Sequence, residues 1–209
     1  FSPNPDPAEL DVLVTTGEQV SVSLFAILCK DAGLRARSLL GFQIPITTNS
    51  NFTRARIMEI DTDRLRGLLD DHDVLVVAGF QGVDCLGRPT TLGRGGSDTT
   101  GVALAAALEA EVCEIYTDVN GVYTTDPNLC STARKLERIS YDEMLEFSSM
   151  GAKVLQIRSV ELAKKFNVPV RVRSTFTDDP GTLVTLEDTE MEDVLVSGIA
   201  YDKDQCRIT

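Results

Sequence analysis

"VLVVAG" (Val74–Gly79), "TTLGRGGSDTTG" (Thr90–Gly101) and "VCEIYTD" (Val112–Asp118) form the stretch that decides the fold. The first segment is an apolar, mostly β-branched run that ends in glycine, which is typical of a parallel strand buried on both faces. The second is rich in glycine and runs into an alanine-rich segment, which predicts a loop and then a helix from Thr99. The third has the composition of a strand. The order is therefore strand, loop, helix, strand.

The same alternation continues on both sides of this stretch. The opening segment, Phe1–Glu9, holds three prolines and predicts a linker, a loop or a truncated entry to the fold. Further strands are predicted at residues 34–40, 55–60, 135–139 and 168–175, with a turn into an edge strand at residues 178–184. Further helices are predicted at residues 15–33, with Val20, Leu24, Ile27 and Leu28 on one stripe, at 61–71 with Asp61 or Thr62 as cap, at 141–147 with a Ser140–Glu143 capping box, and at 152–166.

This alternation predicts an α/β fold with a mostly parallel sheet between helices on both faces. In such folds, ligands bind beyond the carboxyl ends of the strands. We therefore expect functional side chains in the loops that follow the predicted strands.

Composition and charge exclude several classes of function. The 209 residues have a formal net charge of −12, which disfavours a nucleic-acid surface. We find no signal segment and expect no membrane span, since no uninterrupted apolar run reaches about 18 residues. The five cysteines have no CxxC spacing, and the lone histidine, His72, lies in a charged turn. A reduced, cytoplasmic protein without a metal site or a histidine-dependent triad is the simpler interpretation.

The glycine loop is the first candidate site. Gly95 and Gly96 allow backbone N–H groups to approach an anion, and the following helix N-terminus adds partial positive charge. Arg94 offers a two-pronged donor for a carboxylate, and Asp98 can receive an ammonium group or order a metal-bound water. The alternative is a turn in which Ser97 or Asp98 caps the helix. The loop matches neither a P-loop nor the GxGxxG pattern.

The second candidate is "IYTDVNGVYTTDP", Ile115–Pro127, which begins at the carboxyl end of a predicted strand. Thr117 and Asp118 can hydrogen-bond a ribose or base edge, Tyr123 can stack or donate a hydrogen bond, and Asp126 can lie near a metal. An ordinary Asn-Gly turn explains the same residues.

Two single residues complete the candidates. Lys153 lies at the start of a predicted helix, where a cation is unfavourable for the helix dipole unless a phosphate is present; a solvated surface lysine is the alternative. Glu18 follows Thr15 in a T-x-x-E pattern, and a capping box explains it without any function.

Taken together, these segments resemble the aspartate kinases of the amino-acid kinase family in order and spacing over nearly the whole chain. The resemblance rests on "TTGEQVS", "VAGFQG", "TTLGRGGSDTT", "IYTDVNGVYTTDP", "SSMGAKVLQIRSVELAKKFNVPVRVRS" and "DDPGTLV". It implies transfer of the ATP γ-phosphoryl group to the side-chain carboxylate of L-aspartate, with Mg²⁺ accompanying ATP. This reaction opens the route to lysine, threonine and methionine.

The resemblance also assigns roles to residues of this sequence. It implies that aspartate is bound by Glu18, Arg94, Gly95, Ser97 and Asp98, and that ATP is bound by Thr117, Asp118, Tyr123, Asp126 and Lys153. Asp98 and Lys153 are the implied catalytic residues. No metal ligand is assigned.

Two departures from the family pattern affect what we expect. No "KFGG"-type strand and loop precedes Phe1, and Asn128 stands where many relatives have arginine. We expect a kinase domain over residues 1–188 that lacks its N-terminal part, followed at 189–209 by a linker and the first strands of an ACT domain. This implies feedback by lysine and/or threonine in a dimer or higher oligomer of the full protein.

Two alternatives remain open. One is a catalytically silent regulatory or nucleotide-binding portion of such an enzyme. The other keeps the fold but changes the acceptor to glutamate, acetylglutamate or a nucleotide monophosphate.

Overall fold

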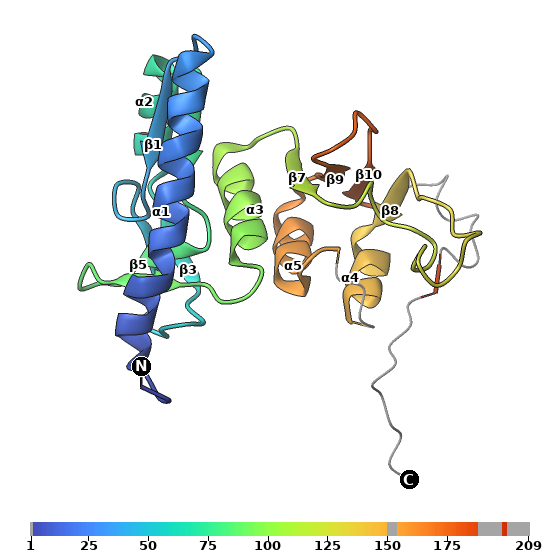
Figure 1. The fold of residues 1–209 in the computed structure, drawn as a ribbon, viewed down its shortest axis with the longest axis horizontal. Coiled ribbons are helices and arrows are strands. Elements are labelled where there is room, and N and C mark those ends of the chain that lie inside the picture. The colour runs from blue at the N-terminus through green and yellow to red at the C-terminus, as the bar shows by residue number, and fades with distance from the viewer. Residues whose placement is uncertain (1, 150–153, 188–197, 200–209) are drawn as a thin grey trace. The chain divides into compact units, whose positions relative to one another are not determined.

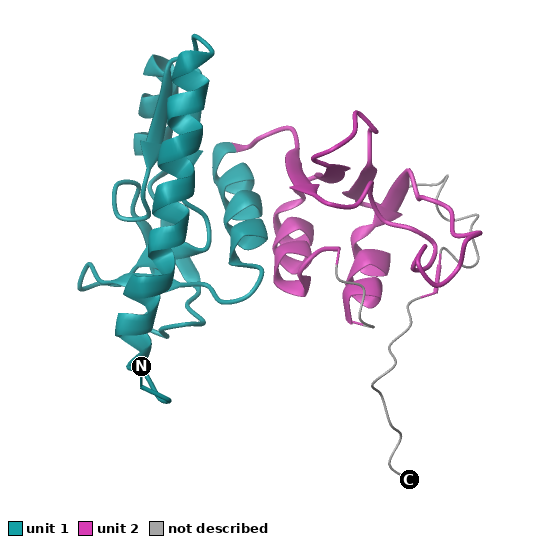
Figure 2. Ribbon diagram, viewed as in Figure 1, with its two compact units in different colours: residues 1–108 teal, residues 109–209 magenta. Residues whose placement is uncertain are grey.

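The computed structural model describes residues 2–149, 154–187 and 198–199. Its helices are α1 (Pro7–Asp31), α2 (Thr62–Asp71), α3 (Gly96–Leu108), α4 (Tyr141–Ser149) and α5 (Ile157–Phe166). Its strands are β1 (Ala36–Leu39), β2 (Ile46–Thr48), β3 (Ile57–Ile60), β4 (Val74–Val77), β5 (Gln81–Val83), β6 (Pro89–Thr91), β7 (Cys113–Thr117), β8 (Arg138–Ser140), β9 (Val170–Ser174) and β10 (Thr182–Thr185). The chain divides into two compact units, unit 1 over residues 1–108 and unit 2 over residues 109–209 (Figure 1, Figure 2).

The order of these elements confirms the predicted α/β class. Among the named strands, four pairings are parallel (β1 with β4, β2 with β5, β7 with β9, β8 with β10) and three are antiparallel (β2 with β3, β5 with β6, β9 with β10). The parallel character is therefore as expected, but each unit mixes both kinds of pairing.

Helix α1 begins well before the predicted start at Thr15. The Asp6 side chain caps it by accepting hydrogen bonds from the N–H groups of Ala8 and Glu9, at 2.9 and 3.2 Å. Pro7 occupies the first helical turn, where its missing N–H has no intrahelical partner to lose. The prediction of an irregular opening segment therefore holds for residues 2–6 and is wrong from Pro7 onward, where α1 begins.

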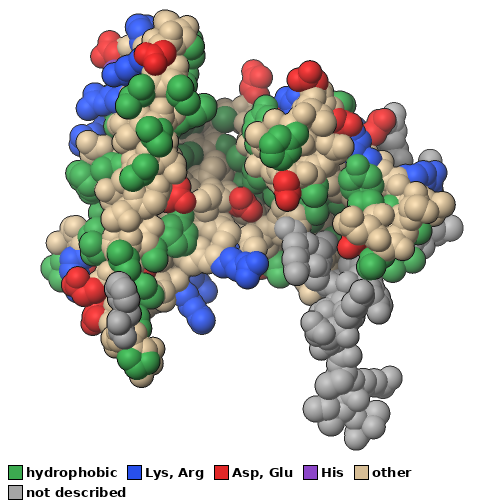
Figure 3. All heavy atoms as spheres, in the orientation of Figure 1, with side chains coloured by type: hydrophobic (Ala, Val, Ile, Leu, Met, Phe, Trp, Pro, Cys, Tyr) green, Lys and Arg blue, Asp and Glu red, His purple; other side chains and the backbone are tan. Residues whose placement is uncertain are grey.

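The face of α1 that packs on unit 1 is not the predicted stripe. The predicted stripe is exposed and consists of Val20, Leu24, Ile27 and Leu28. The buried face consists instead of Asp11, Thr15, Val22, Ala26 and Cys29. Figure 3 shows hydrophobic side chains along the exposed side of α1. Small and polar side chains allow this helix to lie close to β1, β4 and β6, which it contacts.

By length and composition alone, α1 is long and apolar enough to cross a membrane, as core helices of soluble proteins can also be. The contacts of α1 with β1, β4 and β6 identify it as a helix packed on the strands of unit 1.

Strand β4 forms a parallel pair with β1. Leu75 and Val77 of β4 pack against a buried cluster that includes Leu65 of α2, and Figure 1 places α1 in front of the pair and α2 behind it. All four residues of β4, Val74–Val77, are nevertheless half-exposed. The prediction of full burial on both faces is wrong, because β4 is only partly buried. Among the described residues, β1 is the single strand that pairs with β4.

A second sheet of unit 1 has the order β3-β2-β5-β6. The sequence predicted β3 but not β2, β5 or β6, which have three residues each and are too short for a period-2 pattern. The hydroxyl groups of Thr48 and Thr90 hydrogen-bond at 2.5 Å inside this sheet. Since β6 ends at Thr91, the sheet holds the start of the glycine loop.

Unit 2 is built on a sheet of order β7-β9-β10-β8. Strand β10 lies inside this sheet, antiparallel to β9 and parallel to β8, so the prediction of an edge strand is wrong. Helix α4 packs on β8 and β10 and against α5. The predicted capping box of α4 is confirmed, because the Ser140 N–H donates to Glu143 Oε2 at 2.9 Å and the Glu143 N–H donates to Ser140 Oγ at 3.2 Å.

Tyr141 gives unit 2 a pH dependence of stability. It is 2% exposed, its hydroxyl donates to the Val168 carbonyl at 2.7 Å, and burial raises the pKa of Tyr141 to about 12. In the unfolded chain the same phenol titrates near pH ~10. Between about pH 10 and 12 the unfolded state therefore loses a proton that the folded state keeps, so the free energy of unfolding falls as pH rises.

Urea denaturation of the wild type and of Tyr141→Phe measures this effect. Below about pH 10 we expect the wild type to be more stable by roughly 1 kcal/mol, the typical net contribution of a hydrogen bond. That difference is expected to shrink from pH 10 to 12, and a difference that stays constant over this range contradicts the assignment.

Candidate functional site

The glycine loop lies at the carboxyl end of β4. A Cβ atom added to Gly79, two residues beyond β4, would lie 3.3 Å from Ser97 Cα, so the strand end and the start of α3 approach closely. The Leu92 N–H donates to the Phe80 carbonyl at 2.9 Å, which fixes the entry to the loop. The loop therefore lies beyond the carboxyl end of a strand, where α/β folds bind ligands.

Glycine is required at two positions of the loop. Gly93 and Gly95 have φ angles of 77° and 73°, a region that side-chain-bearing residues rarely adopt. Helix α3 begins at Gly96, three residues earlier than predicted, and Ser97 and Asp98 lie in its first turn. A capping residue precedes the first turn, so the alternative in which Ser97 or Asp98 is the N-cap is wrong.

Arg94 stands between Gly93 and Gly95, the two glycines with positive φ angles. It is exposed and makes no hydrogen bond or ion pair with any residue of 2–149, 154–187 or 198–199. Its guanidinium therefore has all five donors available to a ligand. The N-terminus of α3 adds partial positive charge two residues further along the chain.

Glu18 lies in the middle of α1, and the capping-box interpretation of Thr15 and Glu18 is therefore wrong. The Thr15 hydroxyl donates to the Val12 carbonyl at 2.9 Å, as a threonine inside a helix does. Glu18 is half-buried and follows Asp11 and Thr15 on one helical face, since residues three and four apart are neighbours.

Asp11 is a residue of this region that the sequence analysis missed. It is fully buried at 0% exposure. Its Oδ2 accepts hydrogen bonds from the N–H groups of Thr53 and Thr91, at 2.9 and 2.8 Å, and its Oδ1 accepts one from the Thr91 hydroxyl at 2.7 Å. The signal available in the sequence was an aspartate inside the apolar helical segment "ELDVLV".

The second predicted site lies at the carboxyl end of β7 in unit 2. The Thr117 hydroxyl donates to Asp118 Oδ1 at 3.1 Å, and the Thr117 carbonyl accepts a hydrogen bond from the Thr175 N–H at 2.8 Å. The Thr177 hydroxyl donates to Asn120 Oδ1 at 3.0 Å. The segment after β9 is thus bonded to the turn after β7, and the two carboxyl ends lie side by side.

The rest of this turn is also ordered by local hydrogen bonds. Asp126 Oδ1 accepts from the N–H and the side-chain amide of Asn128, at 2.8 and 3.1 Å, so Asn128 holds the turn from within. Tyr123 is half-buried and bridges to Lys135. Lys153 lies outside the described residues.

The structure thus brings Glu18, Arg94, Gly95, Ser97 and Asp98 into unit 1 and Thr117, Asp118, Tyr123 and Asp126 into unit 2. The binding roles of these residues stay predictions.

Comparisons with known proteins show which sequences and structures the chain resembles. The aspartate kinase of Pseudomonas fluorescens (strain SBW25) is 55% identical over 206 residues, which are 98% of this chain and 50% of that protein. The chain therefore spans about half the length of the curated relatives it matches.

Two crystal structures of E. coli aspartokinase III, each 36% identical in sequence, are similar in fold. The complex with aspartate and ADP (R-state) has a TM-score of 0.82 and covers 89% of this chain and 42% of that one. The complex with lysine and aspartate (T-state) has a TM-score of 0.77 and covers 90% and 43%.

A family model with the description "Amino acid kinase family" matches residues 3–174, a range that includes every residue of both candidate sites. The glycine loop after β4, the polar turn after β7 and the α/β order all lie within this match. The chain belongs to the amino acid kinase family.

Proposed function

We propose that the chain is the substrate-binding portion of an aspartate kinase, which transfers the γ-phosphoryl group of ATP to the β-carboxylate of L-aspartate to give 4-phospho-L-aspartate. The observation that carries this proposal is Arg94, an exposed guanidinium between two glycines with positive φ angles at a helix start. The 55% identity to an aspartate kinase supports the choice of substrate. In this role the enzyme begins the route to lysine, threonine and methionine.

The residues of unit 1 fit the recognition of an amino acid. Arg94 pairs with a carboxylate of aspartate through two parallel N–H···O bonds, and Glu18 or Asp98 receives its ammonium group. The backbone of Gly95 and the hydroxyl of Ser97 lie next to Arg94 in the loop and at the start of α3. Asp98 acts here as a proposed catalytic residue, together with Lys153.

The residues of unit 2 fit a nucleotide. Thr117 and Asp118 offer a hydroxyl and a carboxylate to a ribose or base edge, Tyr123 supplies an aromatic ring, and Asp126 lies at the far side of the same turn. Lys153 is proposed to neutralise a phosphate. The complex of E. coli aspartokinase III with aspartate and ADP supports a nucleotide as the second ligand.

Mg²⁺ is proposed to enter with ATP. Among the residues that the structure describes, no three His, Cys, Asp or Glu side chains gather as metal ligands. The ion is therefore expected to be held mainly by the phosphates, as Mg²⁺ commonly is with nucleotides. The chemistry it supplies is neutralisation of the phosphate charge during transfer.

A coupled assay of ADP release tests the proposal. It is run with L-aspartate, glutamate, acetylglutamate and a nucleotide monophosphate, on this chain and on a longer protein that contains it. Release with aspartate alone supports the proposal. Binding of ATP and aspartate without turnover in either protein favours a silent regulatory portion, and release with another acceptor changes the substrate.

A tryptophan reporter tests the nucleotide site separately. The chain contains no tryptophan, so Phe176→Trp introduces a single one. Phe176 is 80% exposed, and its neighbours Thr175 and Thr177 are bonded to Thr117 and Asn120. We expect ATP to change the fluorescence of this variant in a saturable way, because a bound base or ribose lies close to the new indole.

Phe166→Trp is the matched control. Phe166 is 53% exposed and ends α5, just before β9 begins, whereas Phe176 follows the end of β9. The two aromatic positions therefore lie beyond opposite ends of β9 in the sequence. ATP is expected to leave the fluorescence of Phe166→Trp unchanged, and equal responses at both positions, or none at Phe176, would contradict a nucleotide at the β7 turn.

Location and regulation complete the proposal. We propose a cytoplasmic enzyme with a kinase domain over residues 1–188, a dimer or higher oligomer, and feedback by lysine and/or threonine. The complex of E. coli aspartokinase III with lysine and aspartate supports lysine as an effector. The ACT segment expected at residues 189–209 lies outside the described residues except for Gly198 and Ile199.

A further inference from the structure

Asp11 joins three parts of unit 1 that are far apart in the sequence. It lies on α1, and its carboxylate accepts hydrogen bonds from Thr53 in the turn after β2 and from Thr91 at the end of β6. No solvent reaches it, since its exposure is 0%. A buried carboxylate is costly unless it is fully hydrogen-bonded, and three donors at 2.7 to 2.9 Å satisfy that condition.

Both partners of Asp11 act directly on the glycine loop. Thr91 is three residues before Arg94, and its carbonyl accepts a hydrogen bond from the Ala55 N–H at 2.8 Å. Thr53 has a φ angle of 66°, which is unusual for a β-branched residue. Its carbonyl lies over Gly93, because a Cβ atom added there would lie 2.9 Å from Thr53 O. The Asp11 hydrogen bonds therefore fix the position of the loop backbone at Gly93.

The same contact sets the position of α1 relative to the loop. Glu18 is seven residues from Asp11, about two helical turns, and so faces the same side of the helix. The Thr15 carbonyl between them accepts a hydrogen bond from the Gln81 side chain at 3.4 Å, and Gln81 pairs with Thr91 across β5 and β6. The hydrogen bonds of Asp11 thus connect the helix that carries Glu18 to the strand that leads into the loop with Arg94.

We propose that Asp11 is a positioning residue for the amino-acid substrate, which holds Glu18 and Arg94 at the separation that suits an ammonium and a carboxylate on one small molecule. This inference rests on the proposed function of the glycine loop. It assigns no contact between Asp11 and the substrate, because the carboxylate is buried and its hydrogen-bonding sites face Thr53 and Thr91.

Three variants test the proposal on the whole chain. Asp11→Ala removes the acceptor and leaves buried N–H groups without a partner, so the dissociation constant for L-aspartate is expected to rise by roughly 30-fold or more. Asp11→Asn keeps one acceptor oxygen and is expected to show a smaller rise, of roughly 3- to 10-fold. Thr91→Val removes the hydroxyl donor alone and is expected to resemble Asp11→Asn.

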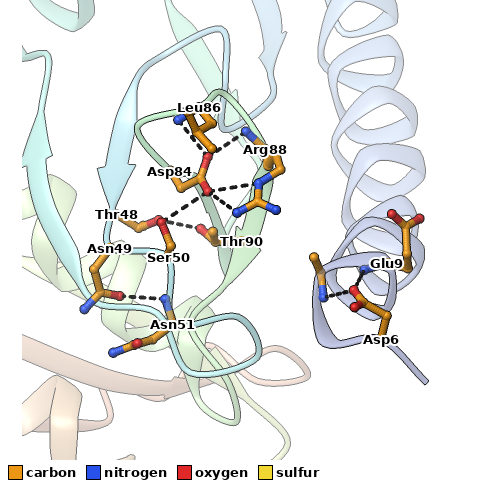
Figure 4. A network of polar contacts seen from close by, with 11 residues as sticks. Asp6, Glu9, Thr48, Asn49, Ser50, Asn51, Asp84, Leu86, Arg88 and Thr90 are labelled. Atoms are coloured by element: carbon orange, nitrogen blue, oxygen red, sulfur yellow. Dashed lines mark hydrogen bonds and ion pairs between the residues drawn. The ribbon is translucent and has the colours of Figure 1, made fainter. Parts of the chain in front are cut away.

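Asp84 provides the matched control, because it is a second buried carboxylate of unit 1, 3% exposed. It accepts hydrogen bonds from Leu86 N–H, Arg88 N–H and the Arg88 guanidinium, and from the Ser50 hydroxyl (Figure 4). Leu86 and Arg88 lie at the turn between β5 and β6, at the end of the hairpin that is remote from Thr91, and Ser50 lies in the segment that follows β2. Asp84→Asn therefore removes comparable hydrogen bonds without touching the loop.

Two readouts separate positioning from general loss of stability. Calorimetry compares the dissociation constants for L-aspartate and ATP, and only the first is expected to change in the Asp11 variants. Hydrogen exchange follows the amides of Leu92–Gly96, which are expected to exchange faster in the Asp11 variants and at the wild-type rate in Asp84→Asn.

The outcomes distinguish this inference from the proposed function. If the wild type binds aspartate and the dissociation constants of Asp11→Asn and Thr91→Val are unchanged, the positioning role alone is overturned. The positioning role is also overturned if Asp84→Asn loses as much affinity for aspartate as Asp11→Asn does. If the wild type binds no aspartate, the proposed function fails. Hydrogen exchange then still tests whether Asp11 holds the loop. If the amides of Leu92–Gly96 exchange at the wild-type rate in the Asp11 variants, that structural role is overturned as well.

Discussion

Replacement of Arg94 by alanine is expected to weaken the binding of L-aspartate by roughly 100-fold and to leave ATP binding unchanged. A two-pronged, charge-assisted pair with a carboxylate is worth about 3 kcal/mol, which corresponds to this loss. The side chain is exposed and makes no hydrogen bond or ion pair with any described residue, so its removal does not weaken the fold. Calorimetric titration with each ligand measures both constants.

Two further variants sharpen this prediction. Arg94→Lys keeps the charge but loses the planar fork, so its affinity for aspartate is expected to lie between those of the wild type and Arg94→Ala. Arg64→Ala removes an exposed arginine from α2 in the same unit and is expected to have no effect. Unchanged aspartate affinity in Arg94→Ala, or an equal loss in Arg64→Ala, contradicts a carboxylate at this loop.

The glycine loop was predictable because its chemistry is local. Glycines at φ angles of 77° and 73°, an arginine between them and a helix directly after them are all properties of neighbouring residues. The start of α3 was placed three residues late, since the pattern of apolar residues begins after the first helical turn. The local sequence was thus enough to locate the loop, whereas the first residue of the following helix was predicted less accurately.

The orientation of α1 could not be predicted in the same way. Apolar residues occur on several sides of this helix, so their spacing is compatible with more than one buried face. In the folded protein the buried face is the one with Asp11, Thr15, Val22, Ala26 and Cys29. Burial of this face depends on Thr53 and Thr91, which supply donors for Asp11 from more than 40 residues away. Such long-range hydrogen bonds leave no periodic signal in the sequence.

Substitution of Gly181 by alanine is expected to give the largest loss of stability, about 3 kcal/mol or more in the free energy of unfolding. Gly181 precedes β10 with a φ angle of 77°, and an added Cβ atom would lie 1.9 Å from the Val172 carbonyl oxygen. A backbone atom of β9 cannot move aside without breaking the pairing of β9 with β10. Because β10 lies inside the sheet, its pairing with β8 is lost as well.

The consequence of this substitution extends to the nucleotide turn. Thr182, the next residue, accepts a hydrogen bond from the Val122 N–H at 2.9 Å and donates one to the Leu136 carbonyl at 2.6 Å. These bonds hold the segment that follows Asp118. We therefore expect Gly181→Ala to lower ATP affinity together with stability, whereas Arg94→Ala changes neither.

Gly87→Ala separates backbone strain from steric overlap in the Gly181 prediction. Gly87 has a φ angle of 76°, nearly that of Gly181, but an added Cβ atom would meet no heavy atom within 4 Å. Its substitution is expected to cost about 1 to 2 kcal/mol, the strain of the left-handed region alone. Urea denaturation of both variants gives the contribution of the Val172 contact as the difference. Equal losses would mean that β9 and β10 yield to the extra methyl group, and that the nucleotide turn depends on something other than the close approach of these two strands.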